Sequence, residues 1–249
     1  MRNKDAIPLS YLVFEKINWL YIHAFRIYKP LYYIYKLRSD RKKIRFLKKH
    51  ICPGMSALDI GANIGFYTTL LSRLVGQKGK VYSFEPNAEN VMNLKKSTRN
   101  RNNVIINQRA VGRLSGQLNL FMSNNLNVDH QTYDIGAGRS AQSVGAVSID
   151  DYFRNGETVD IVKLDIQGFD YYALKGMEKT IARSKNVLLI CELWPYGLKK
   201  AGTLVEDYLL QIKTMGFRLQ LPDGETCTEC VHKTEDKYYY TDVIAVKEA

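Results

Sequence analysis

The fold is decided by one stretch of the sequence, Leu58-Asp59-Ile60-Gly61-Ala62-Asn63-Ile64-Gly65-Phe66-Tyr67-Thr68. This order is typical of a short apolar strand that ends in a glycine-containing turn and opens a helix. Open α/β sheets bind ligands at the carboxyl ends of their strands. Gly61 and Gly65 let the backbone approach a ligand closely, and Asn63 can turn the chain and donate hydrogen bonds. The stretch therefore predicts a ligand site at the end of the first strand.

The spacing of these residues indicates which ligand binds. Glu85, twenty residues after Gly65, ends the next apolar run, where an acid can accept hydrogen bonds from both ribose hydroxyls of an adenosine ligand. The glycines do not follow the G-x-G-x-x-G spacing of pyrophosphate sites, and Asp59 would repel a pyrophosphate. A cationic amino-acid and sulfonium group would not be repelled, which favours S-adenosylmethionine. A nicotinamide-dependent oxidoreductase on the same sheet is disfavoured for the same reason.

Short apolar runs alternate with helical segments in the rest of the chain, which is typical of a parallel sheet with crossover helices. Helices are expected to begin near Gly65, Asn87, Phe169 and Leu204, with Asn87 as a cap. A hairpin is expected around Leu118 to Phe121, and the polar stretch Ser123 to Gly145 is interpreted as a long loop. The expected strands are Ala57 to Ile60, Lys80 to Phe84, Val104 to Asn107, Val159 to Asp165, Val187 to Glu192, Phe217 to Leu221 and Tyr239 to Val246.

Charge divides the 249-residue chain into two parts. The net charge is +11, but residues 1–50 carry 13 Lys/Arg against 3 Asp/Glu, so the remainder is nearly neutral. We therefore expect a basic, aromatic-rich helical leader over residues 1–51 and a catalytic domain over 52–249. The four cysteines are too few and scattered for a disulfide framework, and no uncharged apolar run is long enough to span a bilayer. We expect a cytoplasmic protein that can also associate with a membrane.

The leader contains two adjoining helical stripes of apolar residues, which end at a proline. Pro30 is expected to end or kink this helix, followed by a shorter helix over Leu31 to Leu37 and a basic one over Arg41 to His50. The leader is open to three interpretations: a cap docked on the sheet or on a second subunit, a helix on an anionic membrane, or a nucleic-acid contact. The stripes are Val13, Ile17, Leu20, Ala24 and Ile27, and beside them Phe14, Tyr21, Phe25 and Tyr28.

Five blocks in order resemble the FkbM-type methyltransferase family over about residues 52–249. They are Leu58 to Gly65, Phe84-Glu85-Pro86-Asn87, Ala110-Val111-Gly112, Ser148 to Tyr152, and Ile161 to Phe169. The resemblance implies a class I (Rossmann-like) α/β fold, with a seven-stranded mostly parallel sheet, an antiparallel last strand and preceding N-terminal helices. It also implies S-adenosylmethionine as cofactor and, most often, O-methylation of a hydroxyl on a sugar or a secondary metabolite. Together with a leader that can lie on a membrane, it suggests a polysaccharide or a glycolipid as the acceptor. The cofactor-binding residues would be Asp59, Gly61, Asn63, Gly65, Glu85, Arg109, Ala110 and Asp165.

The last of these blocks departs from the family pattern. Its usual Lys-Ile-Asp-Val-Glu-Gly-Phe-Glu becomes Lys163-Leu164-Asp165-Ile166-Gln167-Gly168-Phe169-Asp170. Asp165 and Gly168 are retained. Gln167 can hydrogen-bond but cannot take a proton, so any role of a carboxylate at this position is in doubt.

Methyl transfer to a hydroxyl needs the acceptor oxygen held in line with the sulfonium methyl, and a positioned base can accept its proton. Asp165, at the end of the fourth strand, is the first candidate for the base. Glu192, at the end of the fifth strand, is the second, with Trp194 beside it as a platform for a sugar face. His130 in the long loop is the third, because histidine titrates near neutral pH.

Several alternatives remain from the residues alone. No metal is expected: Cys227, Cys230 and His232 resemble half a zinc site, but a structural zinc needs four ligands. Nucleic-acid methylation is disfavoured, because Asp165-Ile166-Gln167-Gly168 lacks the acid-Pro-Pro-aromatic loop of enzymes that grip a flipped base, and because the basic excess is confined to the leader. A non-catalytic, membrane-peripheral binding protein on a degenerate methyltransferase fold is the non-enzymatic alternative.

Overall fold

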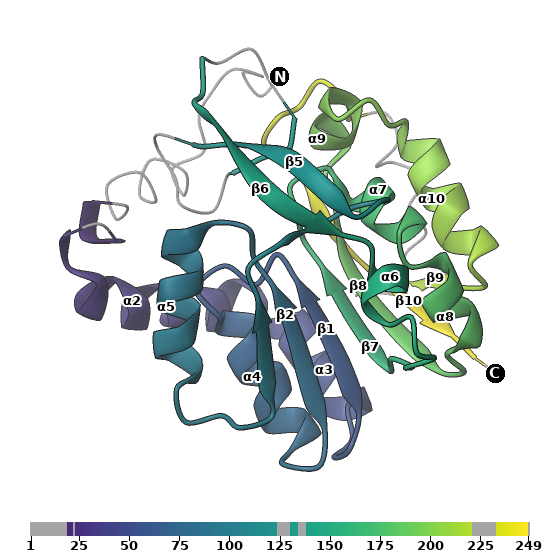
Figure 1. Ribbon diagram of the computed structural model, residues 1–249, viewed down its shortest axis with the longest axis horizontal. Helices are drawn as coiled ribbons and strands as arrows, with labels where there is room; N and C mark the ends of the chain where they lie inside the picture. Colours follow the sequence, from purple (N-terminus) through teal and green to yellow (C-terminus); the bar gives the residue numbers. More distant parts are fainter. Residues whose placement is uncertain (1–18, 22, 124–129, 134–137, 221–232, 249) are drawn as a thin grey trace.

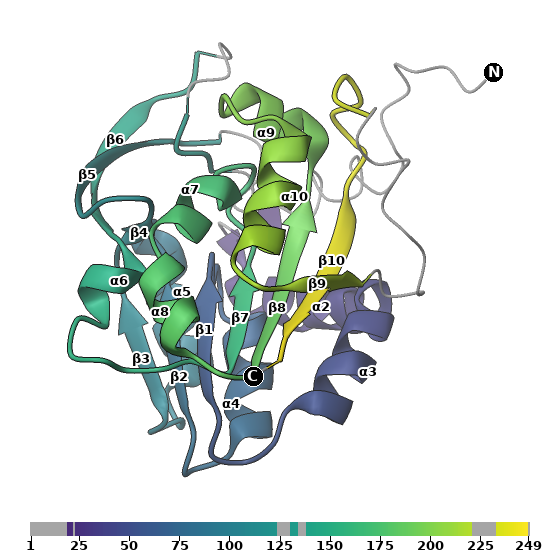
Figure 2. The same ribbon diagram turned by 90° about the vertical axis from the view of Figure 1, so that its right-hand side faces the viewer.

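A computed structural model of the chain describes residues 19–21, 23–123, 130–133, 138–220 and 233–248. Seven strands form its central sheet in the order β3-β2-β1-β7-β8-β10-β9, and only β10 runs against its neighbours (Figures 1 and 2). All seven expected strands are present and the reversed strand is near the end of the chain, so the predicted fold class is confirmed. The strands are β1 (Ser56–Ile60), β2 (Lys80–Phe84), β3 (Val104–Asn107), β7 (Ile161–Leu164), β8 (Val187–Leu193), β9 (Arg218–Gln220) and β10 (Thr241–Lys247).

Helices cover both faces of this sheet. One face is covered by α2 (Phe25–Ser39), α3 (Arg41–His50), α4 (Phe66–Val75) and α5 (Ala88–Thr98). The opposite face is covered by α6 (Ile149–Tyr152), α7 (Asp170–Lys175), α8 (Glu178–Arg183), α9 (Pro195–Lys200) and α10 (Val205–Thr214), and Figure 2 shows the two groups on opposite sides. Asn87 caps α5 as expected, because its side chain accepts a hydrogen bond from the Asn90 backbone N–H at 2.9 Å.

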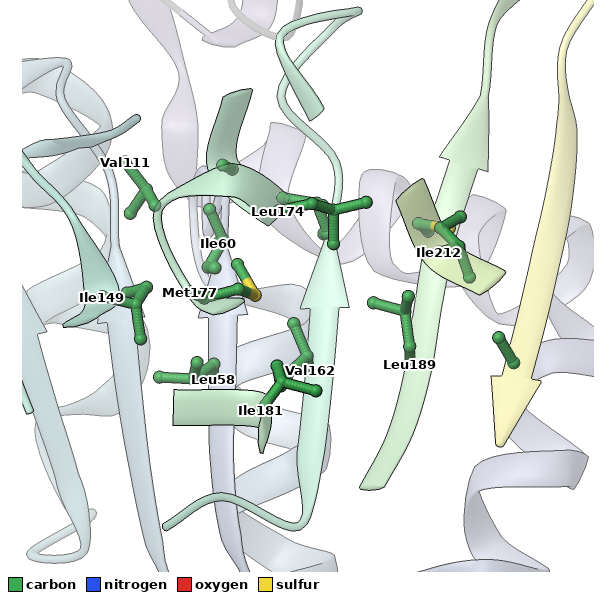
Figure 3. Close-up of a cluster of buried hydrophobic side chains, with 14 of the residues drawn as sticks. Leu58, Ile60, Val111, Ile149, Val162, Leu174, Met177, Ile181, Leu189 and Ile212 are labelled. Carbon is green, nitrogen blue, oxygen red and sulfur yellow. The ribbon is translucent and has the colours of Figure 1, made fainter. Parts of the chain in front are cut away.

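The face under α6 to α10 is apolar along its whole length. Leu58, Val162 and Leu189 of adjacent strands pack there against Leu174 and Ile181, all of them buried (Figure 3). The large apolar area removed from water at this face is the main source of the fold's stability.

The face under α2 to α5 is divided. Its amino-terminal half is apolar, with Ala57, Ile161 and Leu188 packed against α3 and α4. Side chains two residues further along each strand lie on the same face. In the carboxyl half of this face, those side chains are polar. These polar residues are Asp59, Ser83, Lys163, Asp165, Glu192 and Asp242, and the strand register aligns Asp59 with both Ser83 and Lys163, and Glu192 with Asp242. Charged groups therefore gather at the carboxyl edge, where a ligand site was expected.

The leader helices pack directly on this divided face. From α3, Ile44 and Leu47 are buried against the apolar half, and Tyr28 of α2 is buried with Tyr21 and Ile64. Pro30 was expected to end or kink the helix; it does not end it, since α2 runs from Phe25 to Ser39 and includes the segment Leu31 to Leu37 that was expected as a separate helix. Aromatic packing on both sides of the proline, including Tyr28 stacked on Tyr32 at 5.6 Å, holds the helix together despite the lost hydrogen bond. Among the described residues, no helix is long and apolar enough to cross a membrane.

A second, smaller sheet has the order β4-β6-β5, formed by β4 (Ala110–Val111), β5 (Gly116–Phe121) and β6 (Ala141–Val147). The expected hairpin strand at Leu118 to Phe121 is confirmed in β5. The interpretation of Ser123 to Gly145 as a loop is wrong for β6. Small and polar residues obscure this strand in the sequence, because its first three residues are exposed and its buried residues, Val144, Ala146 and Val147, lie in its second half.

Candidate active site at the carboxyl edge of the sheet

The turn after β1 takes a conformation that few residues other than glycine adopt. Its φ angles are +78° at Gly61, +49° at Asn63 and +91° at Gly65, all in the left-handed region. A Cβ on Gly61 would lie 2.0 Å from the backbone oxygen of Asp165, so this position needs glycine for space as well as for conformation. The two strand ends that carry Asp59 and Asp165 are thereby held in direct backbone contact.

Glu85 braces this turn from the end of β2. Its carboxylate accepts hydrogen bonds from the backbone N–H of Asn63 at 2.8 Å and of Asn87 at 3.0 Å. Burial raises the pKa of Glu85, because few water molecules reach the charged form. The acid predicted to hold a ribose therefore fixes the turn after β1, and lone pairs remain on its oxygens for a further donor.

Lys163 links the acidic residues of the two strand ends, and the sequence reasoning missed this role. Its Nζ donates to the Gly61 carbonyl at 2.9 Å and lies 3.6 Å from Asp59 and 3.5 Å from Asp165. Burial opposes its charge, but the carboxylates of Asp165 and Asp59 outweigh that effect and raise the pKa of Lys163. Asp59 is fully buried, and burial raises its pKa; it accepts a hydrogen bond from Thr68 at 2.6 Å.

The leader helices contribute charged groups to the same edge. Lys36 pairs with Asp40 at 2.5 Å and Lys43 pairs with Asp242 at 2.5 Å, while the Tyr67 hydroxyl donates to Asp40 at 2.5 Å. Burial opposes ionisation of Asp40, but the ammonium groups of Lys36 and Lys43 outweigh it and lower its pKa to about 2. These pairs connect α2 and α3 to the start of α4 and to β10.

The three candidate bases differ in charge and position. Asp165 and Glu192 lie on the same face at the ends of adjacent strands. Burial opposes ionisation of Asp165, but Lys163, Lys36 and Lys43 outweigh it and lower its pKa, so this partly exposed side chain is ionised at neutral pH. Burial and the nearby negative charge of Asp165 raise the pKa of Glu192 well above its usual range, which favours its protonated form.

His130 lies outside this pair. Its Nδ1 accepts a hydrogen bond from the Ser123 backbone N–H at 3.0 Å, so the neutral ring carries its proton on Nε2. Burial and the positive charge of Arg139 lower the pKa of His130 to about 4. The nitrogen that would accept a proton is therefore already occupied in this structure.

The residues at which this chain departs from the family pattern are held by hydrogen bonds. Gln167 has a φ of +56° and donates from its side chain to Asp165 at 3.2 Å, so it orients the carboxylate that it follows. Asp170 accepts from the Gly168 backbone N–H at 3.1 Å, and burial together with the charge of Asp165 raises its pKa to about 7.

The other predicted residues lie at the rim or outside the described chain. Arg109 is exposed, directly before β4, and Ala110 is buried within that strand. Trp194 follows β8, and its indole N–H donates to the Lys237 carbonyl at 3.0 Å. The Trp194 ring packs so closely against Gly197 that a Cβ at position 197 would not fit. The Cys227 to His232 segment lies outside the described residues.

The chain is similar to known methyltransferases. The family model described as the methyltransferase FkbM domain matches residues 59–219. Among solved structures, a putative rRNA methylase from Clostridium thermocellum is similar with a TM-score of 0.53 and 13% identity, over 83% of this chain and 95% of that one. A putative methyltransferase from Streptococcus mutans, in complex with SAH, gives a TM-score of 0.49 and 14% identity, over 82% and 95% of the two chains. No curated protein sequence matches the chain.

Proposed function

Because the chain belongs to the FkbM methyltransferase family and uses S-adenosylmethionine as methyl donor, we propose that it methylates a hydroxyl group of a sugar, a polysaccharide or a glycolipid. One observation carries the choice of an oxygen acceptor. An ionised, partly exposed carboxylate, Asp165, lies at the strand end beside Glu192, whose raised pKa favours its protonated form. A hydroxyl needs such an acceptor for its proton, and a positioned base supplies it.

The residues present fit the proposed donor. The N-cap of α4 is Gly65, which provides no side-chain hydrogen bond, so first-turn N–H groups of this ten-residue helix are available to the methionine carboxylate. Asp165, at the neighbouring strand end, would border the methionine half without holding it by a charge pair, while Glu85, and more loosely Arg109 and Ala110, would contact the adenosine half. Asp59 would act through Lys163, because it is fully buried. When bound, S-adenosylmethionine supplies an electrophilic methyl group.

Within this arrangement, each acidic residue at the edge has a separate task. Asp165 accepts the hydrogen bond of the acceptor hydroxyl and takes its proton, and Lys163 with Gln167 keeps the carboxylate in place. Glu192 keeps its own proton and donates a hydrogen bond to a neighbouring oxygen of the acceptor. Positioning contributes much of the rate, because the nucleophile must be held at near-attack distance.

The substrate class rests on further features of the rim. Trp194 lies two residues after Glu192, and Tyr240 is exposed at the start of β10, so aromatic surfaces that suit a sugar face are close to the proposed base. We propose a cytoplasmic location with the acceptor borne on a membrane glycolipid or growing polysaccharide. A secondary metabolite remains the alternative small acceptor, and a non-catalytic binding protein the alternative without chemistry.

The test combines a product assay with one substitution. The enzyme is incubated with S-adenosylmethionine and a panel of nucleotide sugars, glycans and lipid-linked sugars, and products are examined for the mass of one added methyl group. Asp165→Asn is expected to lower turnover about 10²- to 10⁴-fold while S-adenosylmethionine binding, measured by calorimetry, changes little. Asp207→Asn, at an exposed carboxylate on α10, is the matched control. Unchanged turnover in Asp165→Asn would remove it from this role.

An RNA acceptor is the second candidate function. The similar structure from Clostridium thermocellum is described as a putative rRNA methylase, and the exposed side chains of α3 include Arg41, Arg45 and Lys49. Ribosomal RNA therefore belongs in the substrate panel. Methylation of RNA, with strong salt dependence of its binding, would replace the sugar assignment.

A further inference from the structure

The outward face of α2 is apolar and exposed. Ile27, Leu31 and Ile34 recur at helical spacing on this face, and their side chains are 57%, 44% and 49% exposed. Leu37 and Tyr35 flank them and are also exposed. One helix face with this many large exposed apolar side chains is unusual for a surface in contact only with water.

Basic residues surround this apolar stripe. Residues 19–50 contain ten Lys/Arg and a single acid, Asp40. That acid is buried and paired inward with Lys36, whereas Arg26, Arg38, Arg41 and Lys42 are exposed. The outer surface of α2 and the adjoining turn therefore combines apolar side chains with positive charge and no exposed carboxylate.

The inward face of the same helix belongs to the active site. Tyr28 is buried with Ile64 of the cofactor turn, and Lys36 reaches Tyr67 through Asp40. Only the width of one helix, about 10 Å, separates the outer stripe from these contacts. A surface that binds the outer face of α2 would therefore lie close to the carboxyl edge of the sheet.

We propose that the outer face of α2 docks on an anionic lipid membrane. Ile27, Leu31 and Ile34 would enter the boundary between headgroups and acyl chains, with Arg26, Arg38 and the basic residues of α3 near the lipid phosphates. Charge complementarity selects this partner: an anionic bilayer satisfies the apolar stripe and the surrounding cations together. Docking would bring the active site to a head group of the same membrane, and the assignment of that head group as the acceptor rests on the proposed function. The docking itself does not depend on the proposed function.

The experiment measures sedimentation of the full-length protein with vesicles of phosphatidylglycerol and phosphatidylcholine, and with vesicles of phosphatidylcholine alone. Binding is expected to the anionic vesicles, to be weaker without the anionic lipid, and to decrease with added salt. The variant Ile27→Ser/Leu31→Ser/Ile34→Ser is expected to bind at least about tenfold more weakly. The matched control is Leu114→Ser/Leu204→Ser/Leu210→Ser, which removes three leucines that are 74%, 62% and 57% exposed away from the leader.

Two further measurements make the result decisive. Calorimetry with S-adenosylmethionine reports whether both triple variants retain an intact cofactor site, independently of vesicles and of any acceptor. Light scattering in solution reports the oligomeric state. Equal vesicle binding by the two variants would overturn the proposal, as would a dimer that only the α2 substitutions dissociate, since a second copy would then occupy the face. Vesicle binding without methylation of any sugar would leave the docking surface valid and reject the acceptor.

Discussion

Lys163→Met tests whether the buried lysine holds the site together. Methionine keeps most of the aliphatic length and removes the ammonium group, which leaves Asp59 fully buried without its counter-charge and the Gly61 carbonyl without its donor. Removing one partner of a buried ion pair costs about 3–5 kcal/mol, against a total stability of about 5–15 kcal/mol for a domain. We expect urea unfolding to show a loss of that size at pH 7, with Lys78→Met, at an exposed lysine, as the unaffected control.

The double variant Asp59→Asn/Lys163→Met distinguishes a lost ion pair from a lost packing contact. It contains no unpaired buried charge at this position, so at least half of the loss in Lys163→Met should be recovered. The pH dependence has a defined sign. Without the ammonium, the folded-state pKa of Asp59 rises further above its unfolded value, so the single variant should be less unstable at pH 5 than at pH 8. A double variant no more stable than the single one would refute the reasoning.

Three further predictions concern the same edge. Gly61→Ala should destabilise the fold and weaken S-adenosylmethionine binding, because its Cβ would lie 2.0 Å from a backbone oxygen; Gly156→Ala, with a φ of +93° and no atom within 4 Å, should cost only about 1–2 kcal/mol in urea unfolding. Asp170→Asn should flatten the pH dependence of stability between about pH 4 and 7, since a folded-state pKa of about 7 makes the wild type lose stability as pH rises through this range. Tyr67→Phe should lower the free energy of unfolding by about 1–2 kcal/mol through loss of its hydrogen bond to Asp40, and thermal unfolding would show no change if that bond contributes nothing.

The main sheet could be predicted from the sequence because its strands are buried on both faces. Such strands appear as short apolar runs, and the glycine turn and Glu85 identify which strand ends carry the site. The sequence also contained a signal for Lys163: a lysine inside the apolar run Ile161 to Leu164 must be buried and paired. Its partners could not be named from the pattern alone, because Asp59 is about a hundred residues away in the chain.

The remaining features depended on contacts between distant segments. Nothing in the leader indicates that Lys43 pairs with Asp242, about two hundred residues later, or that Lys36 with Asp40 reaches Tyr67. Pro30 usually favours a break or a kink in a helix, but α2 continues through it, with Tyr28 and Tyr32 stacked on each other across the proline. Strand β6 was missed because its small and polar residues resemble those of a loop.

The division of one sheet face into an apolar and a charged half also bears on how the strands find their partners. Shifting any of these strands by one residue would place the side chain of Asp59, Lys163 or Glu192 in the apolar core on the opposite face of the sheet. There the side chain would lose its counter-charge. Each charged residue therefore disfavours a pairing shifted by one residue far more than a leucine in its place would. The groups that serve the site at the carboxyl edge thus also specify the native alignment of the sheet during folding.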